Sequence, residues 1–342
     1  MQTKKRITQQ DVARRAGVTR SMVSYVLNGT DRAVAAGTRE KILRAIDDLG
    51  YRPNRFARAL LMGESAALAD NQIGLVLCNA EVFLRPYYAE IIAGIHSAAH
   101  EHGYHIRFIR FFDELKDPVL FNQLIHSEEV CGLLLLATDQ CLKDENDRRI
   151  ITRIKERIAR IVCVEWKAEG LSSVYLDRQD AAWKATAYLF GRGCTDIAYI
   201  GEFDERVAGF RQAFLERGLG DISRLSITNA RDMPSGYEAV RGLHSAEGTL
   251  PRAICAGSDE VAIGILQYLN ERRIRIPEDT AIISIDNIEM SAYTSPPLTT
   301  VNVQKRAMGC RAVEMIVHNS TGKDDNALIV SLPTTVVVRK SA

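Results

Sequence analysis

The sequence lacks the segments that a membrane protein or a secreted protein requires. Its apolar runs are all shorter than the roughly 20 residues of a transmembrane helix, and it opens with Met-Gln-Thr-Lys-Lys-Arg rather than with the apolar core of a signal peptide. We therefore expect a cytoplasmic protein. The seven cysteines include no C-x-x-C pair and stand mostly in apolar runs, which predicts buried free thiols rather than disulfides or a zinc site.

Motifs for common cofactors and for catalysis are missing as well. The sequence contains no G-x-G-x-x-G and no Walker A loop, which argues against a dinucleotide or nucleoside triphosphate site. It also contains no Ser-centred elbow. His96 and His100 stand one helical turn apart, but a metal site needs a third ligand, so we interpret them as part of a solvated helix face. We expect no enzyme, no cofactor and no metal.

The charge of the chain is unevenly distributed. Hydrophobic residues make up 46% and charged residues 25% of 342 residues, as in globular proteins with two or three domains. The net charge is +1, yet residues 1–63 hold 13 Lys and Arg against five acids, whereas the remainder holds 31 against 38. A basic head on an acidic body predicts that the head binds a polyanion.

The head reads as three short helices. Thr8 can cap a first helix with Asp11 as its reciprocal partner, Gly17 supplies a sharp turn, and Thr19 can cap a second helix. The second helix has apolar residues with a 3.6-residue period, namely Met22, Val23, Val26 and Leu27. Two short helices about a glycine turn are typical of a helix-turn-helix, whose second helix enters the major groove of DNA.

The third helix and the segment after it complete the head. Thr38 is the expected cap of the third helix, whose apolar residues are Ile42, Ala45, Ile46 and Leu49 and which Gly50 closes. Residues 51–60 then read Tyr-Arg-Pro-Asn-Arg-Phe-Ala-Arg-Ala-Leu. Asn54 can cap a short hinge helix, Ala57 is small enough for two copies to pack closely, and Leu60 could wedge into a minor-groove base step.

From Asn71 onward, strands alternate with helices, and residues 86–102 form an amphipathic helix. Short apolar strands are expected at residues 73–78, 106–110, 132–136, 161–164, 197–200, 253–256 and 281–285. Alternating βα units predict parallel sheets covered on both faces, with ligands beyond the carboxyl ends of the strands.

The head and hinge resemble the lactose/galactose repressor (LacI/GalR) family. The motifs that carry the resemblance are Asp11-Val-Ala-x-x-Ala-Gly-Val-Thr, Val23-Ser-Tyr-Val-Leu-Asn28, Thr38-Arg-Glu-Lys41 and Tyr51-x-Pro-Asn-x-x-Ala-x-x-Leu60. The resemblance implies that Arg20, Ser21 and Tyr25 read base edges and that Thr19, Ser24 and Asn28 hold phosphates. It places Asn54, Ala57 and Leu60 in the hinge helix.

The body resembles the effector domain of the same family, which has a periplasmic-binding-protein-like fold. The carrying motifs include Arg206-x-x-Gly209-Phe-x-x-Ala213, Ser258-Asp-Glu-x-Ala-Ile-Gly264 and Ile285-Asp-Asn287. The resemblance implies a helix-turn-helix domain (1–52), a hinge helix (53–63) and a two-lobed effector domain (72–342). The near lobe would comprise 72–176 and 303–330, and the far lobe 177–302 and 331–342.

Several residues near predicted strand ends are candidates for effector binding. Arg206 offers a guanidinium fork for vicinal hydroxyls or a carboxylate, and Asp286 ends a strand and could accept two hydroxyl hydrogens. The resemblance places both positions against the effector; a salt bridge between them is the structural alternative. The other candidates are Tyr87, Tyr88, Glu165 and Ser258.

Four departures from the family pattern bear on specificity. Tyr25 stands where many members carry the Arg that grips guanine, Ala35 stands where a serine is common, and Ser258 replaces an asparagine or aspartate. Leu136 also replaces a polar residue of some sugar sensors, so a lactose-like ligand is not expected.

These features together predict a sequence-specific transcriptional regulator that acts as a repressor. A homodimer would bind double-stranded operator DNA under the control of a small molecule, for which a carbohydrate is the first choice, held between the lobes. The alternatives are a co-repressor-type response to a nucleobase or another small metabolite, and a ligand-binding receptor or an enzyme.

Overall fold

The computed structural model describes residues 7–28, 34–51, 69–219, 227–318 and 327–342. Three helices come first, α1 (Gln9–Ala16), α2 (Arg20–Asn28) and α3 (Ala36–Leu49), and strands alternate with helices in the rest of the chain. By its internal contacts the chain divides into two units. Unit 1 consists of Met1–Leu84, Ile95–Ser173 and Gly309–Ile329, and unit 2 of Arg85–Gly94, Val174–Met308 and Val330–Ala342.

The three head helices share one small apolar core. Val12 of α1, Val23 of α2 and both Ile42 and Ile46 of α3 are completely buried, and Tyr51 closes the cluster. Met22 is an exception to the predicted apolar face, because 39% of its surface is exposed. One helix can bury only a limited stripe against two partners, and Met22 lies outside that stripe.

The third helix begins at Ala36, so the prediction of a Thr38 cap is wrong. Its N-cap is Ala35, whose side chain makes no capping hydrogen bond. The main-chain oxygen of Ala35 instead accepts from the N–H groups of Thr38 and Arg39, at 2.9 and 3.0 Å. Thr38 therefore already lies inside the first turn, where its N–H has a main-chain acceptor.

The first sheet has the strand order β11-β5-β4-β3-β1-β2. Its strands are β1 (Gln72–Leu77), β2 (His105–Phe111), β3 (Gly132–Leu136), β4 (Arg160–Val164), β5 (Ser172–Tyr175) and β11 (Ile329–Ser331). β1 pairs in parallel with β2 and β3, and β3 with β4. Every residue of β1 and β3 is buried, as expected for strands that are covered on both faces.

The second sheet has the order β12-β10-β9-β8-β6-β7. Its strands are β6 (Ile197–Ile200), β7 (Ile227–Thr228), β8 (Ala253–Ala256), β9 (Ala281–Asp286), β10 (Thr299–Asn302) and β12 (Thr335–Val337). The pairs from β7 to β10 are parallel, whereas β12 is antiparallel to β10. Strand β12 follows β11 of the first sheet after a short link.

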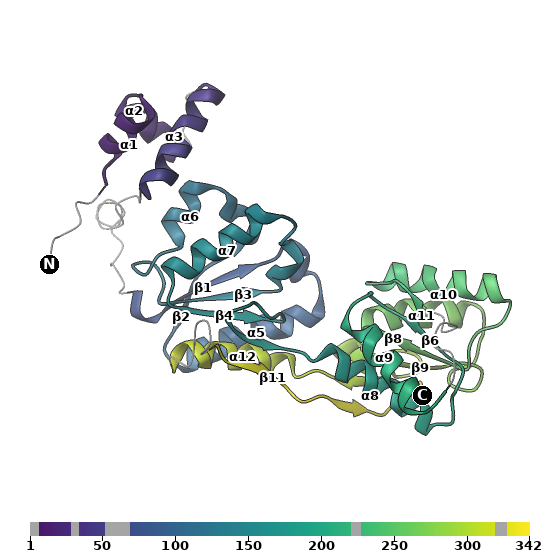
Figure 1. Cartoon of the computed structure of the whole chain (residues 1–342). Coiled ribbons are helices and arrows are strands. Elements are labelled where there is room, and N and C mark those ends of the chain that lie inside the picture. Colours follow the sequence, from purple (N-terminus) through teal and green to yellow (C-terminus); the bar gives the residue numbers. More distant parts are fainter. Residues whose placement is uncertain (1–6, 29–33, 52–68, 220–226, 319–326) are drawn as a thin grey trace. The chain divides into compact units, whose positions relative to one another are not determined.

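Helices cover the two sheets. Those that accompany the first sheet are α5 (Pro86–Glu101), α6 (Pro118–Leu124), α7 (Glu145–Arg157) and α12 (Lys305–Val317). Figure 1 shows α6 and α7 on one side of this sheet, and α5 and α12 on the other. The second sheet is accompanied by α8 (Arg178–Gly191), α9 (Glu205–Glu216), α10 (Met233–Glu247) and α11 (Asp259–Glu271).

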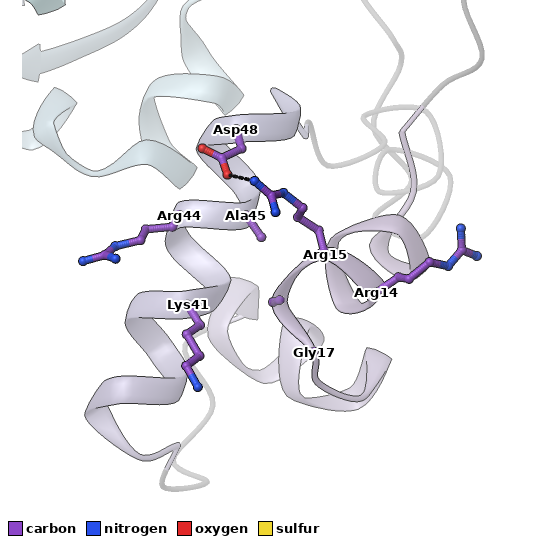
Figure 2. Close-up of a pocket in the computed structure, with 8 residues that line it drawn as sticks. Arg14, Arg15, Gly17, Lys41, Arg44, Ala45 and Asp48 are labelled. Carbon is purple, nitrogen blue, oxygen red and sulfur yellow. Dashed lines mark hydrogen bonds and ion pairs between the residues drawn. The ribbon is translucent and has the colours of Figure 1, made fainter.

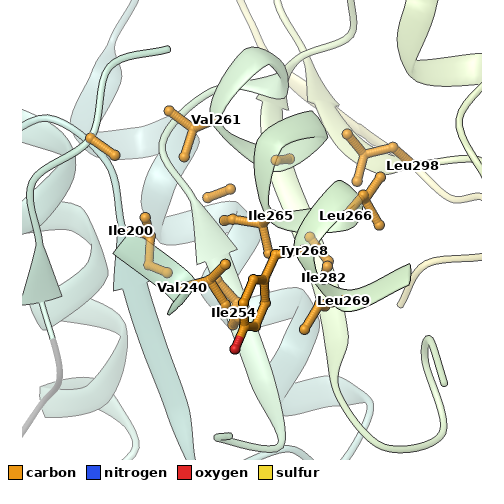
Figure 3. Packing of buried hydrophobic residues seen from close by; sticks show 13 residues of the cluster. Ile200, Val240, Ile254, Val261, Ile265, Leu266, Tyr268, Leu269, Ile282 and Leu298 are labelled. Carbon is orange, nitrogen blue, oxygen red and sulfur yellow. The ribbon is translucent and has the colours of Figure 1, made fainter. Parts of the chain in front are cut away.

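The helices of the second sheet pack in pairs, α8 with α9 and α10 with α11. The second pair closes an apolar cluster of unit 2, in which Ile254 and Ile282 of the sheet meet Val261 and Ile265 of α11 (Figure 3). Gly264 makes this close approach possible, because a Cβ atom there would lie 1.9 Å from the main-chain oxygen of Met233.

All seven predicted strands are present, and the predicted fold class is confirmed: a helix-turn-helix precedes two α/β lobes with mainly parallel sheets. The lobe boundaries given above stay predictions.

The prediction that every cysteine is a free thiol is wrong for one pair. Cys78 and Cys141 form a disulfide with a Cα–Cα distance of 5.7 Å. Cys78 follows β1, and Cys141 ends the 3₁₀ turn after the neighbouring strand β3. The parallel register brings together two segments that are 63 residues apart in the sequence, and spacing along the chain gives no sign of this proximity.

Candidate functional site

The turn between α1 and α2 forms as the sequence predicts. The side chain of Thr8 accepts from the N–H of Asp11 at 3.3 Å, and the N–H of Thr8 donates to the Asp11 carboxylate at 2.9 Å, which completes the capping box. Gly17 ends α1 in the left-handed region with φ 68°, where a residue without Cβ is favoured. Thr19 starts the next helix by accepting from the N–H of Met22 at 3.4 Å.

The first turn of α2 presents polar side chains to solvent. Thr19, Arg20 and Ser21 are exposed, whereas Ser24 and Tyr25 are half-buried. Arg20 donates a long hydrogen bond to Gln9 of α1 at 3.4 Å, which leaves most of its guanidinium donors available. This is the end of the helix that a helix-turn-helix places in the major groove.

The remaining predicted DNA contacts involve residues at the end of α2 or outside the described ranges. Asn28 is the last residue of α2, and nothing further is described of its side chain. Asn54, Ala57 and Leu60 fall outside the described residues.

A basic groove adjoins the α1–α2 turn. It has a volume of about 450 Å³, and its lining includes Arg14, Arg15, Lys41 and Arg44 around Gly17. Figure 2 shows these cations on two helices, with the Arg15 guanidinium 2.8 Å from the Asp48 carboxylate. The basic excess of the head therefore extends beyond the second helix to α1 and α3.

Arg206 lies in the first turn of α9, which follows strand β6 in the sequence. Its guanidinium is hydrogen-bonded to several other protein groups. Its guanidinium donates to Asp204 at 2.6 to 3.1 Å, to Glu202 at 2.8 Å and to the main-chain oxygen of Gly257 at 2.6 Å. Burial lowers the pKa of Arg206, but the hydrogen bonds and charges of these acids outweigh it and raise the pKa well above the ordinary value. The structure thus shows a salt bridge at Arg206, with Asp204 and Glu202 rather than with Asp286 as partners.

Asp286 ends β9 as predicted and is 7% exposed. Burial and the neighbouring charge of Asp259 raise its pKa well above the ordinary value, while Arg206, Lys305 and Arg85 act in the opposite direction. Its two carboxyl oxygens can accept hydrogen bonds from hydroxyl or N–H groups of a ligand.

The residues around the start of α5 belong to unit 2. Tyr87 and Tyr88 are buried and meet edge to face, with ring centroids 5.3 Å apart. Arg85 was not predicted as a site residue. Its Nε donates to Glu260 at 2.9 Å, and its charge interacts with Tyr88 and Asp286. The signal in the sequence was its place two residues before the candidate Tyr87.

The two other candidates have clear local roles. Ser258 caps α11, because its hydroxyl accepts from the N–H of Val261 at 3.3 Å. Glu165 directly follows β4 in unit 1, where it is buried and adopts φ 73°. The structure thus places five of the six candidates in unit 2, namely Tyr87, Tyr88, Arg206, Ser258 and Asp286, and Glu165 in unit 1.

Asp259 and Lys305 are further buried charged residues of unit 2 that were not predicted. Asp259, the first residue of α11, accepts hydrogen bonds from the hydroxyls of Ser284 and Thr300 at 2.5 and 2.6 Å and from the N–H of Ile288 at 2.7 Å. Lys305, the first residue of α12, donates to the main-chain oxygens of Asp286 and Asn287 at 2.6 and 3.1 Å. Both stand in the sequence without any neighbour that would reveal these contacts.

The described ranges contain neither a metal-binding cluster nor a helix that could span a membrane. These residues contain no group of three or more His, Cys, Asp or Glu side chains that could hold a metal ion. Among the helices described, none is long and apolar enough to cross a membrane.

Comparison with known proteins connects both parts of the chain with one family. Residues 8–54 match the model of "bacterial regulatory proteins, lacI family", and residues 186–342 match a "periplasmic binding protein-like domain". The ribose operon repressor of Escherichia coli (strain K12) is 30% identical over 92% of this chain and 93% of its own length.

Two further proteins are similar over nearly the whole chain. The HTH-type transcriptional repressor PurR of Vibrio parahaemolyticus is 29% identical, with 98% of each chain covered. Among solved structures, a complex of the transcriptional regulator CelR with cellobiose has a TM-score of 0.68 and 26% identity, covering 98% of this chain and 100% of that one.

Proposed function

Because the chain belongs to the lacI family of bacterial regulatory proteins, and is therefore a DNA-binding repressor under effector control rather than an enzyme, we propose that its effector is a carbohydrate. The observation that carries this proposal is the polar cluster of unit 2, in which Asp286, the last residue of β9, interacts electrostatically with Arg206 and Arg85. Ligands of parallel α/β sheets bind at this edge.

The chemistry of the cluster supports a ligand with several hydroxyl groups. The Asp286 carboxyl can accept two or more hydroxyl hydrogens, and the hydrogen bonds of Arg85 to Glu260 and to the main-chain oxygen of Arg231 leave further guanidinium donors available. Tyr87 and Tyr88 would contribute an apolar surface, as sugar sites often require. We also assign Glu165 and Ser258 to the site, the latter through its place at the start of α11.

A nucleobase is the second candidate. The observation that favours it is the pair of buried tyrosines, whose rings could pack against a flat heterocycle. A base has fewer hydroxyl groups than a sugar and would use Asp286 mainly as a partner for ring nitrogens. The two candidates therefore differ in how many polar groups of the cluster they engage.

For DNA binding we propose the residues of the head that the resemblance indicates. Arg20, Ser21 and Tyr25 would read base edges, and Thr19, Ser24 and Asn28 would hold phosphates. The hinge residues would act with them, with Asn54 as cap, Ala57 at the contact between two copies and Leu60 as wedge.

We further propose that the protein acts in the cytoplasm as a homodimer on a pseudo-palindromic operator. Effector binding would then shift an equilibrium between two conformations that differ in DNA affinity, by as much as the effector distinguishes them.

The test is a thermal-shift screen of the full-length protein with D-ribose, cellobiose, other sugars, nucleobases and small acids. The carbohydrate proposal predicts that a sugar raises the unfolding temperature and that Asp286→Asn abolishes the shift. A shift with a nucleobase but with no sugar would overturn it in favour of the second candidate.

A further inference from the structure

The strand that carries Asp286 ends in an unusual turn, which we call the Asp286 turn (residues 286–288). Asp286 has φ 122° and Asn287 has φ 54°. Two consecutive residues other than glycine in this region are strained, and such strain persists only where the surroundings fix the main chain. The contacts that fix it here come from residues that are distant in the sequence.

Asp259 holds the turn from α11. Its side chain is completely buried, and one carboxylate oxygen accepts the N–H of Ile288 at 2.7 Å. The other oxygen accepts the hydroxyls of Ser284 on β9 and Thr300 on β10. A single carboxylate thus ties the turn to two neighbouring strands.

Lys305 holds the turn from α12. Its ammonium is 2% exposed and donates to the main-chain oxygens of Asp286 and Asn287, and the Glu90 carboxylate lies 3.4 Å away. The turn oxygens therefore have a cationic donor, whereas the turn N–H of Ile288 has an anionic acceptor.

A role in folding alone would not require these two charges. The core of unit 2 beside them is apolar, and burying a carboxylate and an ammonium costs free energy that apolar side chains would avoid. Both charges instead converge on the main chain of the Asp286 turn, Lys305 at the oxygens of Asp286 and Asn287 and Asp259 at the N–H of Ile288.

We propose that Asp259 and Lys305 are positioning residues for the effector: they fix the main chain of the Asp286 turn from two sides and thereby determine where the Asp286 carboxyl meets the ligand. This inference rests on the proposed function. Asp286 itself is faced by charged groups from four elements, namely Asp259 of α11, Lys305 of α12, Arg206 of α9 and Arg85 before α5.

The first arm of the test measures hydrogen–deuterium exchange of the full-length protein by mass spectrometry. Asp259→Ala should speed exchange in peptides that cover residues 286–291 by roughly ten-fold, because the N–H of Ile288 loses its acceptor. Lys305→Met should also speed exchange there. Asp259→Asn should restore protection, because its amide oxygen can accept from Ile288 while its NH₂ donates to the two hydroxyls.

The matched control is Asp147→Asn. Asp147 is another buried aspartate in the first turn of a helix, but it lies in unit 1 on α7 and pairs with Lys116. This variant should leave exchange at residues 286–291 unchanged. Unchanged exchange in both Asp259→Ala and Lys305→Met, or a rise spread evenly over unit 2, would overturn the proposal. Should Asp259→Ala fail to fold, Thr300→Val removes one donor of the same carboxylate and is expected to loosen the same peptides.

A second arm separates this proposal from the proposed function. Thermal shifts with D-ribose, cellobiose and adenine are compared for the parent, Asp259→Ala, Asp259→Asn and Asp286→Asn. Loss of a ligand shift in Asp259→Ala with recovery in Asp259→Asn supports the positioning role, and an intact shift despite an opened turn overturns it. An intact shift in Asp286→Asn would instead refute the assignment of Asp286 to the effector, while the exchange result would still decide whether the turn is fixed by Asp259 and Lys305.

Discussion

The N–H of Ile288 donates to the carboxylate of Asp259 at 2.7 Å, across 29 residues of sequence. This contact joins the first turn of α11 to the segment that follows β9. It places a buried negative charge beside Asp286, whose own pKa is raised in consequence of burial and of that charge. The titration of these two acids should therefore be visible in the pH dependence of the protein's stability.

The pH dependence of stability has a definite sign at Asp259. Burial raises its pKa from 3.8 to about 6, so between these values the folded state holds a proton that the unfolded state has lost. The contribution of this group to stability is then greatest below pH 4 and declines as the pH rises toward 6. The measurement is thermal unfolding of both proteins from pH 3.5 to 8. The stability of Asp259→Asn relative to the parent should increase between about pH 4 and 6 and stay constant at higher pH. A constant difference at every pH would show that the pKa is not raised.

Gly264 should tolerate no larger residue. A Cβ atom would lie 1.9 Å from the main-chain oxygen of Met233, so Gly264→Ala must push α10 and α11 apart. We expect a loss of about 1–3 kcal/mol in the free energy of unfolding, measured by chemical denaturation. The control is Gly242→Ala on α10, where nothing lies within 4 Å of the added Cβ. That variant should gain about 0.5–1 kcal/mol because alanine favours a helix, and equal effects at the two positions would contradict the packing described.

Arg20 should contribute to sequence preference. A duplex that the full-length protein enriches from a random pool serves as the specific probe, and a shuffled duplex as the nonspecific one. Arg20→Ala should weaken specific binding by about 1–3 kcal/mol while changing nonspecific binding much less. Arg241→Ala on α10, where the side chain is 54% exposed, is the control and should change neither. A loss of equal size on both duplexes would assign Arg20 to phosphate instead of base contacts.

The sequence was sufficient to predict those structural features that depend on local patterns of residues. The capping box of Thr8 and Asp11, the turn at Gly17 and the end of β9 at Asp286 were all predictable. Each follows from residues a few positions apart. Asp286 and Arg206 could also be named from the family resemblance, but the partners of the Arg206 guanidinium could not.

The remainder depends on contacts between distant segments. The roles of Asp259 and Lys305 arise only because β9, β10, α11 and α12 meet at one sheet edge. The disulfide of Cys78 and Cys141 likewise requires the register of two parallel strands. No periodicity or spacing encodes such a meeting, which explains why these residues were missed or wrongly interpreted.

The most direct test of effector control measures the affinity for the enriched duplex by fluorescence anisotropy, at fixed salt, with and without each compound that stabilises the parent protein. We expect a carbohydrate to change the affinity of the parent and to leave that of Asp286→Asn unchanged, while both proteins bind DNA equally well without ligand. A ligand response of full size in Asp286→Asn, or a response to nucleobases alone, would contradict this expectation.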